Sequence, residues 1–161
     1  MKKLFSIMML CTILLGLAGC VDKEAQEEVK NYIDTTSVIF KEQEQKMLAS
    51  YSSVIGMNYT DDTTLCMELV TNTIPMADAL LSTASAVTET ITNEELKEVH
   101  GFYVSYATEF VDALRSLLKA VDEQDKSYTE VANAKLSNAD GHAKSFRSGL
   151  DELKKKYKLE E

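Results

Sequence analysis

Three cysteines and two histidines are the side chains of this chain best suited to chemistry, and they are widely spaced. Cys11 and Cys20 lie within and at the end of an apolar N-terminal run, whereas Cys66 is the single cysteine of the remaining chain. Thiolates act as nucleophiles and as metal ligands. Cys66 has no second cysteine beside it in the body of the chain, so we expect no internal disulfide there.

The two histidines could ligate a metal ion or a haem if facing helices placed them at one level. For antiparallel helices joined near residue 124 or 125, His100 is level with Gly149 and His142 with Ala107, about 10 Å apart along the axis. That separation is too long for one shared ion. No Glu-x-x-His pair and no Cys-x-x-Cys-His motif is present in the sequence. Haem held between Met47 and His142 is the one such pairing worth testing.

The other polar and aromatic residues do not form a catalytic pattern. Cys66 falls in the first turn of a predicted helix, which favours a thiolate, but a lone thiol without a basic neighbour is more typical of a small core residue. Four aromatic residues could line a pocket, although their helical spacing favours a core: Phe102, Tyr103, Tyr106 and Phe110. We therefore predict no catalytic residues, no metal ligands and no enzyme activity.

The N-terminal segment has the three parts of a secretory signal peptide. Lys2 and Lys3 are followed by an apolar run from Leu4 to Leu17, which ends in small residues and Cys20. A helix needs about 20 apolar residues to cross a bilayer, and this run is shorter. The pattern therefore predicts a cleaved segment and no permanent span.

The last residues of this segment, Leu17-Ala18-Gly19-Cys20, resemble the lipobox of bacterial lipoproteins. The resemblance covers residues 1–20 and implies cleavage just before Cys20, with diacylglycerol and acyl chains attached to it as the only covalent group expected. Residues 1–19 are then the signal peptide and residues 20–161 the folded domain. The resemblance also places the protein on the extracytoplasmic face of a cell membrane or outer membrane, because two or three acyl chains hold a protein there durably.

The charge of the domain bears on its partners. Without Lys2 and Lys3, fifteen basic residues face 26 acidic ones, a formal net charge of −11. Nucleic-acid binding needs a basic face, so we expect no nucleic-acid partner.

Apolar residues recur every three or four positions in four segments of the domain, which indicates amphipathic helices. The segments span about 24–55, 63–90, 92–122 and 127–157. The apolar stripes predicted as core include Val29, Phe40 and Met47 in the first segment, Leu65 and Leu69 in the second, and Ala139, Phe146, Leu150 and Leu153 in the fourth. The stripe of the third segment is Leu96, Val99, Tyr103, Tyr106, Phe110, Ala113, Leu117 and Val121. Capping boxes are predicted at Thr92 with Glu95 and at Ser127 with Glu130. Short polar turns between the segments predict an all-α fold, an antiparallel up-down-up-down four-helix bundle.

One proline and one glycine could modify these helices. Pro75 either kinks the second helix or splits it, and we favour a kink because Thr71 and Thr73 can bond the freed backbone groups. Gly141 lies near the level of Tyr106 and Phe110, so we expect it to make room for an aromatic ring.

The predicted bundle has two differently charged ends. The C-terminal turns carry a basic cluster that would lie beside the lipid anchor: Lys154, Lys155, Lys156 and Lys158. These lysines either contact an anionic leaflet or simply oppose the helix dipole. The two distal turns form an acidic tip, which could hold a cation or a basic partner but is more typical of solvated, capped turns: Asp61, Asp62, Asp122, Glu123 and Asp125.

The function expected from the sequence is an anchored interaction or structural module that docks an envelope protein. The alternatives are binding of a small apolar molecule between the helices, and a metal or haem site.

Overall fold

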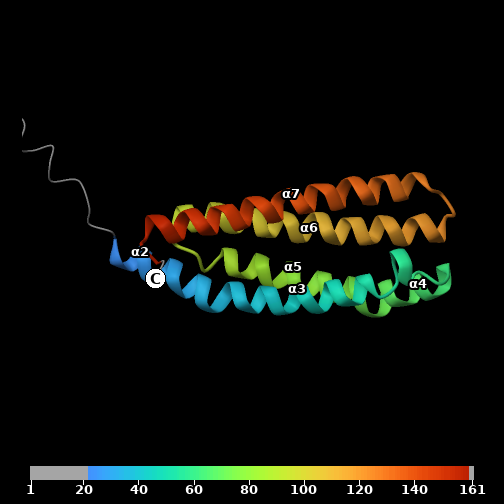
Figure 1. The fold of residues 1–161 in the computed structure, drawn as a ribbon, viewed down its shortest axis with the longest axis horizontal. Coiled ribbons are helices and arrows are strands. Elements are labelled where there is room, and N and C mark those ends of the chain that lie inside the picture. The colour runs from blue at the N-terminus through green and yellow to red at the C-terminus, as the bar shows by residue number, and fades with distance from the viewer. Residues whose placement is uncertain (1–21, 160–161) are drawn as a thin grey trace, which may run out of the picture.

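A computed structural model describes residues 22–159 of the chain (Figure 1). The described residues are helical with connecting turns, and no strand occurs among them. The predicted all-α fold class is therefore confirmed. The signal peptide and Cys20 lie outside the described residues, so both stay predictions.

The helices follow one another with short connections. The first helical run consists of α2 (Lys23–Asn31), a π-helical turn η1 (Tyr32–Thr36) and α3 (Ser37–Ser52). A 3₁₀ turn η2 (Gly56–Asn58) leads to a second run of α4 (Asp62–Glu68), η3 (Leu69–Thr73) and α5 (Ile74–Thr88). Two long helices follow, α6 (Glu94–Asp122) and α7 (Ser127–Lys156). The predicted segments agree with these bounds to within three residues.

The helix starts use different caps from the predicted ones. Asn93, and not Thr92, caps α6, since its side chain accepts a hydrogen bond from the backbone N–H of Leu96 at 2.9 Å. At α7 the backbone N–H of Ser127 donates to Asp125 at 2.9 Å. Both predicted capping boxes are therefore wrong. At α6 the neighbouring Asn93 supplies the cap, whereas at α7 the N-cap residue is Lys126 and its side chain makes no capping bond.

Thr92 instead joins the first helical run to the start of α6. Its backbone N–H and its hydroxyl each donate to the Glu28 carboxylate at 2.7 Å, and the backbone N–H of Asn93 donates at 3.1 Å. Partial burial opposes ionisation of Glu28, but these hydrogen bonds outweigh it and hold its pKa below the usual value.

Pro75 neither ends nor splits the second helical run, which stays helical from Asp62 to Thr88. The π-helical turn η3 ends two residues before Pro75. The hydroxyl of Thr71 donates to the Met67 carbonyl at 2.7 Å, and that of Thr73 lies 3.4 Å from the Glu68 carbonyl. Both threonines thus bond backbone carbonyls at the wider π turn, but these are not the carbonyl of Thr71, which the missing N–H of Pro75 leaves free, so the predicted bonds to freed groups are not the ones observed.

The core runs along the whole length of the helices. Most positions of the predicted apolar stripes are buried, including Val29, Leu69, Leu96 and Leu153. The stripe predicted on α6 was too narrow, because further positions on this helix are also buried: His100, Ala107, Val111, Leu114 and Ala120. Since α6 packs against both α5 and α7, more than one line of its side chains is covered.

The register of α6 and α7 follows from their contacts. Lys156 pairs with Glu95 at 2.5 Å and Lys135 with Asp112 at 3.0 Å, so the two helices run in opposite directions (Figure 1). They pack closely at Gly149, where a Cβ would lie 2.7 Å from a Val99 methyl. The expectation for Gly141 was wrong, because a Cβ there would meet nothing within 4 Å.

Within residues 22–159, none of the helices combines the length and the apolar character that a membrane span requires.

Candidate functional site: an aromatic groove between α3 and α7

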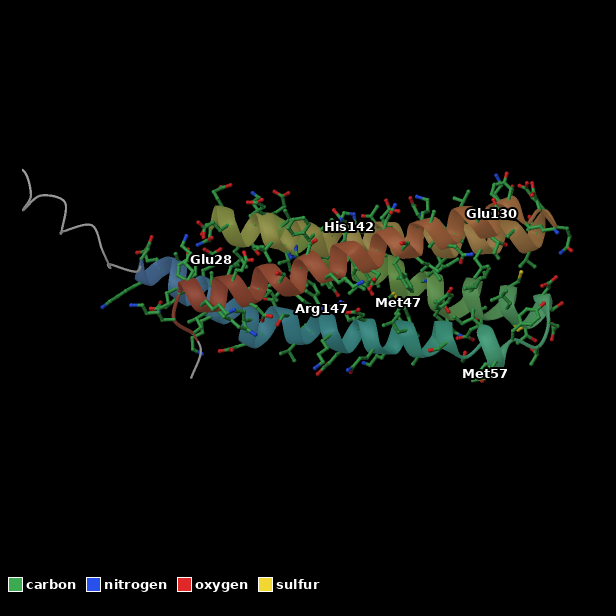
Figure 2. All side chains as sticks on the ribbon, turned by 45° about the horizontal axis from the view of Figure 1, so that its top comes forward. Glu28, Met47, Met57, Glu130, His142 and Arg147 are labelled. Carbon is green, nitrogen blue, oxygen red and sulfur yellow. The ribbon has the colours of Figure 1, made fainter. Side chains whose placement is uncertain are left out.

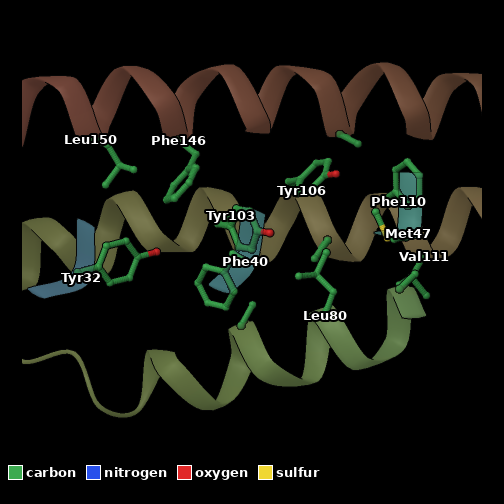
Figure 3. Close-up of a cluster of buried hydrophobic side chains, with 14 of the residues drawn as sticks. Tyr32, Phe40, Met47, Leu80, Tyr103, Tyr106, Phe110, Val111, Phe146 and Leu150 are labelled. Atoms are coloured by element: carbon green, nitrogen blue, oxygen red, sulfur yellow. The ribbon is translucent and has the colours of Figure 1, made fainter. Parts of the chain in front are cut away.

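A groove of about 570 Å³ lies between α3 and α7, with α6 at its floor. We call it the aromatic groove, because rings from three helices form most of its apolar lining, together with two leucines: Phe40, Tyr103, Tyr106, Phe146, Leu48 and Leu150. Figure 3 shows Phe146 extending from α7 toward the ring of Tyr103, while Leu150 lies above Tyr32. The side chains of α3 and α7 do not fill the space between these two helices, so the groove stays open.

The rings of the aromatic groove are in direct contact. Tyr103 stacks on Phe40 with ring centroids 4.6 Å apart and contacts Phe146 at 4.9 Å. Phe40 is 1% exposed and Tyr103 3%, so the floor is fixed by burial. A floor of fixed rings offers a preformed apolar surface, which is typical of small-molecule sites.

The hydroxyl of Tyr103 is the unusual group at this floor. It is buried and has no hydrogen-bond partner among residues 22–159. Burial raises the pKa of Tyr103, and the charge of Glu44 raises it further, so the group is a neutral hydroxyl with a proton to donate. A buried polar group without a partner costs free energy, which a bound acceptor would recover.

The neighbouring tyrosine is satisfied within the protein. The Tyr106 hydroxyl donates to the Glu44 carboxylate at 2.8 Å. Burial, followed by the Glu44 charge, raises the Tyr106 pKa above its ordinary value. Glu44 is therefore engaged at the floor of the groove.

Charged side chains form the rim of the aromatic groove. Lys154 lies 3.6 Å from Asp151. Lys41 and Arg147 are exposed, and neither forms an ion pair within the described part of the chain. Each follows directly on a buried floor residue, Phe40 or Phe146, so the two cations stand on opposite walls near the level of Tyr103.

His100 lies in the core beneath the groove, and its side chain does not face Gly149. Its Nε2 is 2.8 Å from the Ala84 carbonyl, which can only accept, so Nε2 carries the proton. Nδ1 of the neutral ring then accepts a hydrogen bond from the Tyr32 hydroxyl at 2.7 Å. Burial lowers the pKa of His100, although the bond to Ala84 opposes this. The predicted level holds, since Gly149 packs against Val99, but His100 itself points toward α5 and the first helical run.

His142 lies in a different environment, at a half-buried position beside Ser105 and Thr108 of α6. This agrees with its predicted level near Ala107. Met47, its proposed partner for haem, is fully buried in the core. Within the described residues, no group of three or more His, Cys, Asp or Glu side chains could hold a metal ion.

The predicted aromatic set divides between three environments. Tyr103 and Tyr106 line the aromatic groove, whereas Phe110 packs against Tyr51 with centroids 5.7 Å apart. Phe102 lines a different hollow of about 640 Å³ over α6 and α7, beside Glu95 and Glu98. That hollow is larger than the aromatic groove, but its carboxylates and its ion pair with Lys156 make it a polar surface feature.

Cys66 is a half-buried free thiol in the second turn of α4, four residues after the first helical residue Asp62, so the predicted first-turn position was wrong. Burial raises the pKa of the Cys66 thiol, and the charges of Asp62 and Asp122 raise it further. These surroundings oppose the thiolate form that a first-turn position would favour. Cys66 is therefore a small packing residue.

The basic cluster lies beside the first described residues of the chain. The Gln26 side chain donates to the Tyr157 carbonyl at 2.7 Å, which joins the end of α7 to α2. Figure 1 shows the start of α2 and the end of α7 at the same end of the molecule. In this cluster Lys156 pairs with Glu95 at 2.5 Å, while Lys155 and Lys158 are exposed.

The acidic tip is formed where two turns meet. Gln124 donates to Asp62 at 3.3 Å, and this contact joins the turn after α6 to the start of α4. Asp61 accepts from the backbone N–H of Thr64 at 2.9 Å, and Asp125 accepts from the backbone N–H of Ser127 at 2.9 Å. Glu123 pairs with Lys119 at 3.5 Å.

These carboxylates therefore serve as helix caps or pair with nearby side chains, which agrees with the capped-turn interpretation. Asp122 adds its charge near Cys66.

Sequence reasoning named two groove residues, Tyr103 and Tyr106, but missed Phe40, Phe146 and the rim cations. A signal was present: Phe40-Lys41 and Phe146-Arg147 each place a cation directly after an aromatic residue of a predicted core stripe. Comparisons with protein-family models, with curated proteins and with solved structures returned no match to this chain.

Proposed function

We propose that the protein is a bacterial lipoprotein, anchored through acyl chains on Cys20 to the extracytoplasmic face of a membrane. The observation that carries this proposal is the sequence from Lys2 to Cys20, which ends in Leu17-Ala18-Gly19-Cys20. The described domain begins at Asp22, which caps α2, so very few residues separate the anchor from the first helix.

We further propose that the folded domain is an up-down-up-down four-helix bundle standing on the membrane. The helical runs 23–52 and 62–88, together with α6 and α7, are its four members in this arrangement. The contact between Gln26 and Tyr157 supports it, because it brings the end of α7 to the start of α2. Lys155 and Lys158 would then face an anionic leaflet, worth about 1 kcal/mol each.

The activity that we assign to this domain is interaction with an envelope protein, with no catalytic step. Support comes from apolar side chains at the end of the molecule far from the anchor. Met57 is fully exposed in the turn after α3, and Met67 of α4 is 63% exposed (Figure 2). Exposed methionines adapt to irregular partner surfaces, which suits a docking role.

Replacing the lipidated sulfur tests the anchor directly. The full chain and its Cys20→Ser variant are expressed in bacteria, and membranes are separated from soluble protein by sedimentation. We expect the parent chain in the membrane fraction, with an intact mass that lacks residues 1–19 and carries lipid. The Cys20→Ser variant should show neither the lipid mass nor the cleavage before residue 20.

Cys66→Ser is the matched control, since it makes the same atomic change at the thiol of α4 and should leave fractionation and mass unchanged. A Cys20→Ser chain that is still cut before residue 20 and still sediments with membranes would refute the anchor.

A further inference from the structure

We propose that the aromatic groove binds a free anionic amphiphile with a slender apolar body, of which a long-chain fatty acid is the simplest example. This inference concerns the body of the protein and does not depend on the lipid anchor.

The shape of the groove supports a slender ligand. Its α3 wall runs from Ser37 to Leu48, about 16 Å at 1.5 Å per residue. Its volume of about 570 Å³ falls within the usual range for small-molecule sites. A hydrocarbon chain lying along α3 and α7 would cover the exposed edges of Phe40, Phe146 and Leu150.

The Tyr103 hydroxyl supports a ligand with an acceptor atom. This hydroxyl is buried at the groove floor, in a side chain that is 3% exposed, and it has no partner among the described residues. Nearby Tyr106 shows that the protein can satisfy such a group, since it donates to Glu44. A ligand oxygen next to Tyr103 would supply the hydrogen bond that this hydroxyl lacks within residues 22–159.

The rim cations support a negative charge on that ligand. Lys41 and Arg147 stand on opposite walls near the level of Tyr103, and neither is ion-paired within residues 22–159. A carboxylate at this level would accept from the Tyr103 hydroxyl and meet both cations, which offset the negative charge of Glu44 in the same groove. An acyl chain joined to Cys20 by an ester or amide carries no such charge, so the groove fits a free acid better.

Photolabelling of the full chain tests this proposal. The protein is reconstituted into phosphatidylcholine nanodiscs and irradiated with palmitic acid that carries a diazirine in its chain, and labelled peptides are identified by mass spectrometry. We expect saturable labelling of peptides from α3 and α7, competed by palmitic acid and competed less by hexadecanol, which lacks the charge.

Two neutralised cations of the same helix give the matched comparison. Arg147→Gln removes a rim cation and should raise the half-saturating probe concentration about fivefold. Lys144→Gln removes an equal charge one turn away, where Lys144 pairs with Asp140 and does not line the groove, and should leave that concentration unchanged. Equal effects of the two variants would overturn the role of charge in the proposal.

A filled groove gives the second arm. Ala143 is half-buried at one end of the groove, so Ala143→Trp places a large ring in the space that the ligand would take. Circular dichroism shows whether this variant keeps its helices, and labelling of α3 and α7 should then fall at least tenfold. Labelling that does not saturate, that spreads evenly over all helices, or that survives in a folded Ala143→Trp protein would overturn the proposal.

Discussion

Two buried tyrosines lie on Phe40, and their surroundings differ. Tyr32 and Tyr103 are each 3% exposed. The Tyr32 ring lies 6.5 Å from that of Phe40 and the Tyr103 ring 4.6 Å. The Tyr32 hydroxyl donates to His100 at 2.7 Å, whereas the Tyr103 hydroxyl has no partner in the described part of the chain.

The difference separates a region that holds the fold together from one that is open to a ligand. Around Tyr32 a chain of hydrogen bonds runs through His100 to the Ala84 carbonyl, so every polar group there has a partner. Around Tyr103 the walls formed by α3 and α7 stand apart and the hydroxyl stays unbonded. Satisfied buried networks specify a structure, while an unsatisfied group at a groove floor is the arrangement that a bound molecule completes.

Removing the hydroxyl from the closed region should have the largest effect. Tyr32→Phe leaves Nδ1 of His100 buried without a donor, which costs about 2 kcal/mol of unfolding free energy. Urea denaturation at pH 8, followed by circular dichroism, measures this loss. A variant as stable as the parent would show that the network contributes nothing and would remove the contrast between the two tyrosines.

The contact between α6 and α7 at Gly149 extends the comparison, because there the absence of a side chain lets the two helices pack closely. At Gly149 an added methyl would lie 2.7 Å and 2.9 Å from the two Val99 methyls, and valine has little freedom to turn away. The crowding costs about 1–3 kcal/mol and exceeds the gain in helix propensity of about 1 kcal/mol. Gly149→Ala should therefore destabilise the protein by about 1 kcal/mol.

Gly141 is the control on the same helix, because a methyl there meets no atom within 4 Å. Gly141→Ala should stabilise the protein by about 1 kcal/mol through helix propensity alone. Thermal and urea unfolding of both variants check the opposite signs, and two changes of the same sign would refute the close packing at Gly149.

The pH dependence of stability tests the closed region in a milder way. Burial lowers the folded-state pKa of His100 below the ordinary 6.5, so the unfolded chain binds this proton first. The unfolding free energy should be steady above about pH 6.5 and fall as the pH drops below that value, levelling off once His100 is protonated in the fold as well.

Urea unfolding between pH 8 and 5.5 avoids the lower range in which Glu28 titrates. His100→Asn should flatten the dependence of unfolding free energy on pH in this range. His142→Asn should leave that dependence unchanged. An equal slope in parent and His100→Asn would exclude His100 as its source.

The fold was largely predictable from the sequence because apolar spacing identifies helices and their buried faces. Positions such as Val29, Leu69 and Phe146 were predicted as core and are buried. Caps were not predictable at this precision, since Asn93 and Thr92 are adjacent and both residue types can cap. The roles of Gly141 and Gly149 depend on how α7 is rotated about its axis. Matching residues by their height along antiparallel helices does not give that rotation.

The aromatic groove was beyond prediction for a physical reason. Helical spacing places Phe40, Tyr103 and Phe146 toward the interior, but it does not say whether α3 and α7 close over them. That outcome depends on the distances between helices, which are set jointly by all the side chains in between. Likewise, the sequence does not show which residues face Arg147 across the groove, so it could not show that Arg147 has no ion-pair partner among the described residues.

The most direct test of the groove as a ligand site is Tyr103→Phe, measured both for stability and for binding of the diazirine palmitic acid. Removing a buried hydroxyl that has no partner leaves the unfolding free energy of the unliganded protein unchanged or raises it by about 1 kcal/mol. The same change should raise the half-saturating probe concentration about fivefold. A variant that loses stability but labels with undiminished affinity would contradict the account.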